Sequence, residues 1–484
     1  MAEKSLKDKT ISGVLWSAIQ KFGTLGISFV SNIVLARLLS PDDYGCIGML
    51  AIFIAVSMTF IDGGFGSALI QKKVPTQEDY STIFWWNLFV SIVLYVLFYL
   101  ASPWIADFYK IEKLNDLLRI QGIVLIINSF NVIQVNQLRK KLKFKLLAIV
   151  NVVSSVVSVI IAIIMAWKGM GVWALVANQL LHSSFNTILL WLTTGWYPSL
   201  CFSFKSFKSL FGFGGFMLLS NIINTICDNI HGILIGKILS PSILGYYTQS
   251  RKLEEIATSS ISGVVNQVAY PVFSDKQREK KSLITILSKF ITFISFCVFP
   301  LMILLILVAE PLITVLYSDK WIECVPFFKI LCIAGLAISL QMINYNAVAA
   351  VGQSAVLFKW TIIKRSIGLT LNILGIVLFG IYGLLFANVL TAYILYIINS
   401  YLVSQYVGYK IKDQLKDIMP TLVISVVSYF LTSICQTQLS NFDIYLILIF
   451  TILIFFVIYF ILSRFFNRNI FNIFFSVTYD LMHK

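Results

Sequence analysis

Residues 149–167 read IVNVVSSVVSVIIAIIMAW and contain no charged side chain. Residues 450–463, which read FTILIFFVIYFILS, form a second uncharged run. A helix that crosses the hydrocarbon core of a membrane needs about 20 mostly apolar residues, whereas the strands of a membrane barrel alternate apolar and polar residues over about 10 positions. Because these runs do not alternate, they predict an all-α integral membrane protein.

The composition of the whole chain suits lipid better than water. Hydrophobic residues make up 58% of the 484 positions and charged residues 12%, and the mean hydropathy is +0.87. Soluble domains average roughly 45–50% apolar and 25% charged residues. The net charge is +15, but the basic residues lie in short loops between apolar runs, so no binding to nucleic acid is expected.

The apolar runs predict about fourteen transmembrane helices, each of about 20 residues or more. They cover approximately residues 11–37, 44–70, 80–105, 113–137, 143–167, 171–194, 209–237, 242–272, 283–308, 322–349, 353–378, 381–405, 418–436 and 443–466. Lys and Arg gather in alternate loops, as at Lys72 and Lys73, whereas loops on the opposite side carry acids such as Asp42 and Asp43. Because short cytoplasmic loops are enriched in Lys and Arg, both termini are expected to be cytoplasmic.

One motif recurs along the chain. Residues 35–41 read LARLLSP and residues 235–241 read IGKILSP, and Gly45 and Gly245 follow at the same distance. In both places the motif joins two predicted helices. The spacing of the two copies predicts that the chain contains an internal structural repeat.

A weaker echo pairs LVANQL at residues 175–180 with LFANVL at residues 385–390. Parallel repeats about an axis along the membrane normal are a known transporter plan, in which the substrate site lies between the repeats. We therefore expect two six-helix lobes, residues 1–205 and residues 206–408. Two additional helices and a cytoplasmic tail are expected in residues 409–484.

Residues 32–45, NIVLARLLSPDDYG, resemble the first helical hairpin of polysaccharide exporters. Residues 68–72 (ALIQK), 84–87 (FWWN) and 169–178 resemble later parts of the same proteins. These are lipid-linked oligosaccharide flippases of the O-antigen and capsule type, in the multidrug/oligosaccharidyl-lipid/polysaccharide exporter superfamily. The resemblance implies two six-helix bundles with two further helices. It also implies a polyprenyl-diphosphate-linked oligosaccharide as substrate, moved across the bacterial inner membrane by alternating access.

An ionisable residue inside a spanning helix costs roughly 2.5–3.5 kcal/mol and usually faces a cavity or a partner. The basic residues that are candidate ligands of the substrate diphosphate are Lys21, Arg251, Lys252 and Arg365. Members of the family that the chain resembles place basic residues on the first two helices of each lobe, and Lys21 and Arg251 have this placement.

Each of these basic residues also has a structural interpretation. Lys21 lies near a helix end, from which it can snorkel to the interface. Arg251 can form an ion pair with Glu255 one turn along the helix. Neighbouring residues point about 100° apart on a helix, so Lys252 can point outward, and only one of Lys364 and Arg365 is expected to face a cavity.

Asp62 and Asp228 are candidate sites for a coupling proton or sodium ion, although either can equally neutralise a nearby lysine. Asn221 and Asn224 are candidate hydrogen-bond partners for sugar hydroxyls, but amides in membrane helices also join helices to one another. The sequence contains no nucleotide-binding loop, metal-ligand cluster or nucleophile–base arrangement. Neither a cofactor nor an enzymatic reaction is therefore expected.

The sequence thus predicts a flippase for surface polysaccharides such as lipopolysaccharide O-antigen or capsule, with a polysaccharide polymerase and assembly proteins as candidate partners. One alternative is a cation-coupled multidrug extruder of the same superfamily, whose cavity should be acidic or apolar. A second alternative is a membrane-embedded glycan polymerase or glycosyltransferase. Such enzymes commonly have a large extracytoplasmic loop or a soluble domain, whereas the longest loops predicted here have about 10–17 residues.

Overall fold

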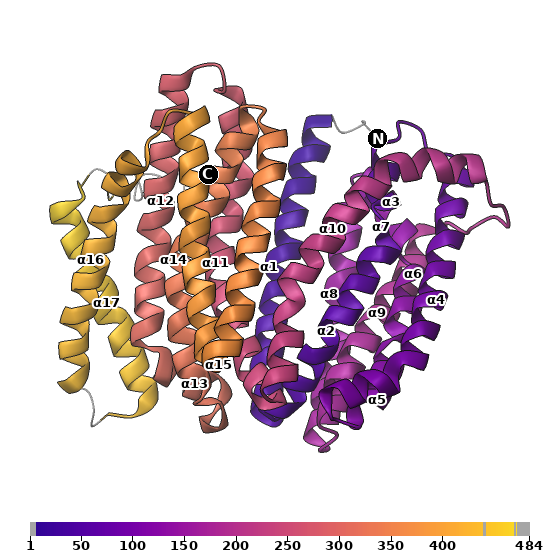
Figure 1. Ribbon diagram of the computed structural model, residues 1–484, viewed down its shortest axis with the longest axis horizontal. Helices are drawn as coiled ribbons and strands as arrows, with labels where there is room; N and C mark the ends of the chain where they lie inside the picture. Colours follow the sequence, from indigo (N-terminus) through magenta and orange to yellow (C-terminus); the bar gives the residue numbers. More distant parts are fainter. Residues whose placement is uncertain (1–5, 439–441, 469–470, 472–484) are drawn as a thin grey trace. The chain divides into compact units, whose positions relative to one another are not determined.

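The computed structural model describes residues 6–438, 442–468 and 471, and within these ranges the regular secondary structure is entirely helical (Figure 1). The chain divides into two compact units, unit 1 (Met1–Gly245) and unit 2 (Tyr246–Lys484). The expectation of an all-α fold is therefore confirmed. Residues 469–470 and 472–484 of the expected C-terminal tail lie outside the described residues.

Unit 1 is a bundle of long helices interleaved with short ones (Figure 1). Its helices are α1 (Leu6–Leu38), α2 (Pro41–Asp62), α3 (Phe65–Gln71), α4 (Gln77–Tyr109), α5 (Lys113–Gln121), α6 (Ile123–Ser129), α7 (Val132–Lys140), α8 (Phe144–Trp167), α9 (Val172–Thr194) and α10 (Phe204–Ile238). Helix α8 packs against α1 and α9, and α10 packs against α2, α3 and α4. Helices α5 and α6 pack against α4 and α9.

Two helices of unit 1 begin with the same local signal. The Ser40 hydroxyl accepts a hydrogen bond from the Asp43 backbone N–H, and the Asp43 carboxylate accepts one from the Ser40 N–H. Thr76 and Asp79 form the same reciprocal pair at the start of α4. Such capping boxes satisfy backbone donors that have no partner within the helix, and so they define where α2 and α4 begin.

Unit 2 consists of α11 (Pro241–Asp275), which starts in the last residues of unit 1, and the elements that follow it. These are α12 (Lys280–Leu307), α13 (Ala309–Tyr317), the 3-10 turn η1 (Asp319–Trp321), α14 (Cys324–Ala350), α15 (Ser354–Tyr406), α16 (Ile411–Gln438) and α17 (Ile444–Phe466). Helix α12 packs against α14 and α16, α14 packs against α15, and α16 packs against α17.

Helix α15 is two helices, residues 354–379 and 381–406, joined at Gly380, whose φ is 62° and ψ is −145°. The two parts fold back on each other, because a Cβ on Gly383 would lie 2.0 Å from the carbonyl oxygen of Gly375. The sequence predicted this boundary as the end of one helix near residue 378 and the start of the next at 381.

The expected helix over residues 44–70 is interrupted. Gly63 and Gly64 have φ values of 56° and 66°, which is left-handed backbone, so α2 ends before them and α3 begins after them. The expected helix over residues 113–137 is divided into α5, α6 and α7. Within the described part of the chain, 10 helices are long and apolar enough to cross a membrane. The count of about fourteen spans stays a prediction.

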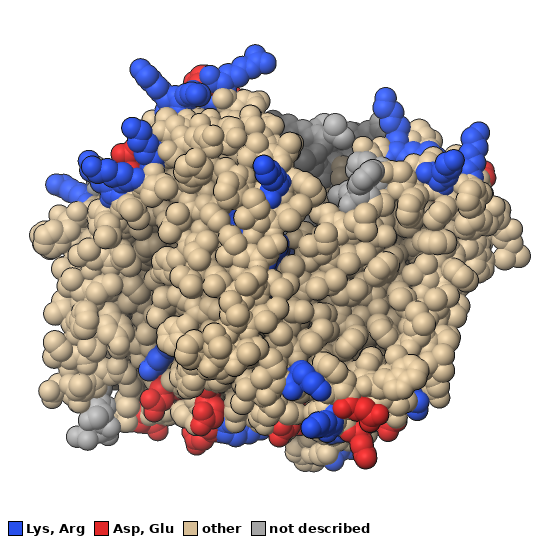
Figure 2. Space-filling view, in the orientation of Figure 1, with Lys and Arg blue, Asp and Glu red and all other residues tan. Residues whose placement is uncertain are grey.

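The surface of each unit has the character of a membrane protein. In each unit, most of the charged side chains gather at the ends of the helices, and the middle of the visible face is mostly uncharged (Figure 2). Large apolar side chains on α4 are exposed, such as Phe89 at 59% and Leu100 at 60%. Exposed apolar surface of this extent is compatible with lipid as the surrounding solvent, so the chain is a multi-pass membrane protein.

Candidate functional site

The best-defined charged group among the candidate ligands is Arg251 on α11 in unit 2. Its Nε donates a hydrogen bond to Glu255 Oε1 at 2.7 Å, and its Nη1 donates one to the Tyr247 hydroxyl at 3.3 Å. These residues are four apart, so they lie along one face of α11. Asn388 Nδ2 on α15 lies 3.4 Å from the same hydroxyl, to which it donates.

This cluster holds a guanidinium at a partly exposed position. The Arg251 side chain is 32% exposed and that of Glu255 is 56% exposed. The ion pair is the structural alternative that the spacing predicts. A partly exposed ion pair of this kind contributes only about 0–1 kcal/mol to the stability of the fold. A stabilising role alone therefore does not explain why Arg251 and Glu255 are paired here. The contacts orient the planar guanidinium, which is the geometry that bidentate phosphate binding requires.

The neighbouring candidates in unit 2 differ in burial. Lys364 is 7% exposed, and its Nζ donates to Asn399 Oδ1 at 2.8 Å and lies 5.8 Å from the centre of the Tyr345 ring. Arg365 and Lys252 are half-buried. Lys364 therefore points into the interior of unit 2. Lys364 and Arg365 are neighbours on one helix, and the sequence predicted that only one of them would face a cavity.

A buried polar network joins α14, α15 and α16, and one of its members, Ser400, directly follows Asn399, the acceptor of Lys364. The Gln414 Oε1 atom of α16 accepts hydrogen bonds from Asn344 at 3.2 Å, Ser400 at 2.9 Å and Tyr396 at 3.4 Å. These residues were not predicted from the sequence. Amide side chains within apolar helices are the sequence feature that could have indicated such a network. Which of these polar side chains bond to one another depends on how α14, α15 and α16 pack.

In unit 1, three candidates share a face of α10. Asn221, Asn224 and Asp228 are spaced three and four residues apart, and Asn221 and Asp228 are exposed whereas Asn224 is half-buried. Lys21 is exposed on α1. The structure thus brings the two amides and one carboxylate together as a polar strip on α10.

Asp62 is the last residue of α2. A Cβ on Gly66 would lie 3.0 Å from Asp62 Oδ1 and 2.7 Å from Asn136 Nδ2, so the glycine allows both side chains to approach α3. Asp62 itself is exposed. The structure therefore places this carboxylate at the exposed end of α2, beside α3.

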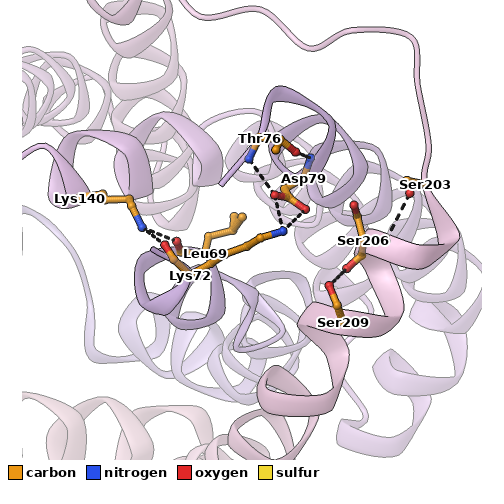
Figure 3. Close-up of polar contacts among 8 residues, drawn as sticks. All are labelled: Leu69, Lys72, Thr76, Asp79, Lys140, Ser203, Ser206 and Ser209. Carbon is orange, nitrogen blue, oxygen red and sulfur yellow. Dashed lines mark hydrogen bonds and ion pairs between the residues drawn. The ribbon is translucent and has the colours of Figure 1, made fainter. Parts of the chain in front are cut away.

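A second charged cluster of unit 1, which was not predicted from the sequence, is centred on Asp79 (Figure 3). The Asp79 side chain is 1% exposed, and its Oδ2 lies 2.6 Å from Lys72 Nζ. Lys140 Nζ donates to the carbonyl oxygens of Leu69, Ile70 and Lys72 at the end of α3. Lysine at a helix C-terminus satisfies carbonyls and favours the helix dipole, so this cluster joins α3, α4 and α7.

No group of three or more His, Cys, Asp or Glu side chains in the described ranges is arranged to hold a metal ion. The candidate residues described above are cations, carboxylates and amides on apolar helices. Such groups in a membrane mark paths for ions or charged substrates.

Residues 34–326 match the model of a family described as polysaccharide biosynthesis protein. The chain is 30% identical over 358 residues to the teichuronic acid biosynthesis protein TuaB of Bacillus subtilis (strain 168), a match that covers 74% of each chain. It is 27% identical over 361 residues to the succinoglycan biosynthesis transport protein ExoT of Rhizobium meliloti (strain 1021), a match that covers 74% of this chain and 72% of that protein.

Among solved structures, the lipid II flippase MurJ in an inward closed conformation has a similar fold. The match covers 94% of this chain and 99% of that chain, with a TM-score of 0.75 and 16% sequence identity. At this identity the likeness concerns the fold. The chain thus shares the all-helical fold of that membrane protein.

Proposed function

Because the chain belongs to the family of polysaccharide biosynthesis proteins, we propose that it is a flippase for lipid-linked oligosaccharides. It moves polyprenyl-diphosphate-linked repeat units across the cytoplasmic membrane of a bacterium, by alternating access, for the assembly of a surface polysaccharide. The observation that carries this proposal is the family match over residues 34–326 in a multi-pass helical protein. The relative ExoT is named as a transport protein, and MurJ as a lipid II flippase.

The diphosphate of the substrate is bound by basic side chains. Arg251 is the principal ligand, because Glu255 and Tyr247 hold its guanidinium in a fixed orientation at a partly exposed position. Lys252, Arg365 and Lys21 supply additional positive charge. Asn221 and Asn224 on α10 donate and accept hydrogen bonds with sugar hydroxyls.

Asp62 and Asp228 couple transport to a proton or sodium ion. Both are carboxylates on long apolar helices, α2 and α10. Neutralising a carboxylate lowers the free-energy cost of placing it in a low-dielectric environment. Binding of a cation to either residue therefore favours the conformation in which that residue is less hydrated.

Both termini face the cytoplasm, because the loops on that side carry the excess of Lys and Arg. The sugar units then arrive on the opposite face of the membrane, where a polysaccharide polymerase and assembly proteins use them. The protein itself makes or breaks no covalent bond in this scheme.

The test is to delete the gene and measure lipid-linked oligosaccharide on each face of the membrane. Trapped intermediates on the cytoplasmic face should disappear when the wild-type protein is restored. Arg251→Ala and Lys21→Ala should fail to restore transport, whereas Arg278→Ala, which removes an exposed charge with no partner among the described residues, should restore it. Immunoblots of membrane fractions establish equal amounts of each variant.

If the deletion strain has normal surface polysaccharide and no trapped intermediate, the flippase assignment is wrong. Drug efflux would then be tested by sensitivity to cationic compounds. If Arg251→Ala restores transport fully, the substrate class stands but Arg251 is not its ligand.

A further inference from the structure

A cavity of about 390 Å³ lies within unit 1, among α4, α5, α6 and α9. It is lined by Tyr95, Tyr99, Asp116, Arg119 and Trp173, together with two isoleucines. None of these residues belongs to the proposed substrate or coupling-ion sites. A single cavity therefore contains a cation, a carboxylate and three aromatic rings.

Arg119 is held in position by its neighbours. Its Nε donates a hydrogen bond to Ser102 Oγ at 2.9 Å, and this hydroxyl lies 2.6 Å from Asn115 Oδ1. The guanidinium carbon lies 4.4 Å from the centre of the Tyr99 ring. Its terminal N–H groups have no hydrogen-bond partner in the described ranges, so an oriented cation presents at least two donors to the cavity.

Asp116 lies three residues before Arg119 on α5, but the two side chains do not form an ion pair. Asp116 is exposed and makes no hydrogen bond with any residue that the structure describes. The cavity thus contains two opposite charges that are not in direct contact with each other. A ligand that carries both a negative and a positive group complements this arrangement better than an anion or a cation alone.

The aromatic rings complete the site. The centres of the Tyr95 and Tyr99 rings are 6.3 Å apart, and Trp173 lines the same cavity. A Cβ on Gly122 would lie 3.2 Å from the Tyr95 ring, so the glycine allows this ring to lie against the junction of α5 and α6. The faces of such rings attract ammonium groups.

The position of the cavity along α4 indicates which molecules reach it. Helix α4 has 33 residues and is about 50 Å long, whereas the hydrocarbon core is about 30 Å thick. Exposed apolar side chains continue along α4 beyond Leu100 to Trp104, which is 73% exposed, and Phe108, which is 43% exposed. Because tryptophan is enriched at membrane interfaces, Tyr99 lies close to the depth of lipid head groups.

We propose that this cavity binds the zwitterionic head group of a phospholipid, in which a phosphate is adjacent to a primary ammonium, as in phosphatidylethanolamine. Arg119 donates to the phosphate, and Asp116 and the faces of the tyrosine rings bind the ammonium. The acyl chains lie along Ile120 and Ile123, which are 39% and 37% exposed. This inference does not depend on the proposed flippase function.

Native mass spectrometry of the purified, delipidated full-length protein tests the proposal. The protein is incubated with equal amounts of phosphatidylethanolamine and phosphatidylglycerol, and the retained lipid adducts are counted. The wild type should retain more phosphatidylethanolamine. Arg119→Gln should lower this retention about fivefold or more, since hydrogen bonds to charged groups are strong. Asp116→Asn should lower the phosphatidylethanolamine-to-phosphatidylglycerol ratio.

Matched controls separate the site from general charge effects. Glu112→Gln removes an exposed negative charge outside the cavity and is the control for Asp116→Asn. Arg278→Gln removes an exposed positive charge outside the cavity and is the control for Arg119→Gln. Both controls should leave the phosphatidylethanolamine retention and the phosphatidylethanolamine-to-phosphatidylglycerol ratio unchanged. A photoactivatable phosphatidylethanolamine on the wild type should label peptides of α4, α5 or α9, a measurement that requires no variant to fold.

Three results would overturn the proposal. The first is equal or greater retention of phosphatidylglycerol by the wild type, because an anionic lipid would then satisfy the site. The second is labelling by the photoactivatable lipid only in peptides outside α4, α5, α6 and α9. The third is an unchanged phosphatidylethanolamine-to-phosphatidylglycerol ratio in Asp116→Asn, because Asp116 would then not bind the ammonium and the zwitterionic assignment would be wrong.

Discussion

Gly45 on α2 and Pro241 on α11 meet backbone to backbone, because a Cβ on Gly45 would lie 1.9 Å from the Pro241 carbonyl oxygen. The contact is reciprocal. A Cβ on Gly245 would lie 2.0 Å from the carbonyl oxygen of Pro41. These are equivalent positions in the two copies of the repeated motif, so the copies face each other through the glycines they share.

We expect Gly45→Ala and Gly245→Ala each to destabilise the protein. No side chain can move aside, because the atom that a methyl group would meet is a backbone oxygen. Overpacking of a close contact costs about 1–3 kcal/mol. Thermal unfolding in detergent, followed by tryptophan fluorescence, should show a lower midpoint for both variants.

Gly26→Ala is the matched control. Gly26 lies within α1, and no atom lies within 4 Å of the position that its Cβ would take, so a methyl group there meets open space. Alanine is a better helix former than glycine by about 1 kcal/mol, so this variant should be as stable as the wild type or more stable. Equal midpoints for Gly45→Ala and Gly26→Ala would contradict the close contact.

The helices could be predicted from sequence because burial in lipid makes a spanning segment apolar over its whole length. The repeat was also visible, since Gly45 and Gly245 follow the same motif. The contact between the two copies of the motif could not be predicted, because sequence similarity between two segments does not indicate whether they are in contact. The break at Gly63 and Gly64 was missed for a related reason, since glycine is also common inside membrane helices.

The candidate sites were predicted less completely than the helices. The pair of Arg251 and Glu255 follows from local spacing on one helix, and the structure contains it. The burial of Lys364 and Asp79 depends on the helices packed against them, which a single sequence does not specify. Which of the candidate charges bind the substrate stays a prediction.

We expect Gly380→Ala to destabilise unit 2 through backbone strain alone. Gly380 has a φ of 62° and a ψ of −145°, a conformation that is essentially restricted to glycine. No atom lies within 4 Å of the position that a Cβ would take, so steric contact with neighbours contributes nothing. The cost should be about 1–3 kcal/mol, measured as a lower unfolding midpoint. Gly212→Ala, at an open position in α10, is the control.

The ion pair of Lys72 and Asp79 should contribute measurably to stability, because the carboxylate is buried. Lys72→Met removes its cation and two hydrogen bonds of 2.8 and 2.6 Å. The expected cost is about 1.5–3 kcal/mol. Lys73→Met, which removes an adjacent exposed charge, should cost little.

A double-mutant cycle with Asp79→Asn isolates the pair. If the two side chains stabilise each other, the double variant should be less destabilised than the sum of the single variants. Additive effects, with Lys72→Met no more costly than Lys73→Met, would show that the pair is not formed in the membrane protein. The measurement is again the unfolding midpoint in detergent.

Lys364 and Asn399 should show an asymmetric response to substitution. Lys364 is buried, and Asn399 Oδ1 is its hydrogen-bond acceptor at 2.8 Å. Asn399→Leu leaves a buried ammonium without this acceptor, at an expected cost of about 3–5 kcal/mol. Lys364→Met leaves only a neutral amide oxygen unpaired, which costs about 1–3 kcal/mol.

The order of unfolding midpoints should therefore be wild type, Lys364→Met and Asn399→Leu, from highest to lowest. The Lys364→Met/Asn399→Leu double variant should unfold above Asn399→Leu, because replacing both polar groups with apolar side chains removes the unpaired charge. Lys359→Met, an exposed lysine on the same helix, should match the wild type. If Asn399→Leu is no less stable than Lys364→Met, the ammonium has an alternative acceptor, and burial of Lys364 does not depend on Asn399.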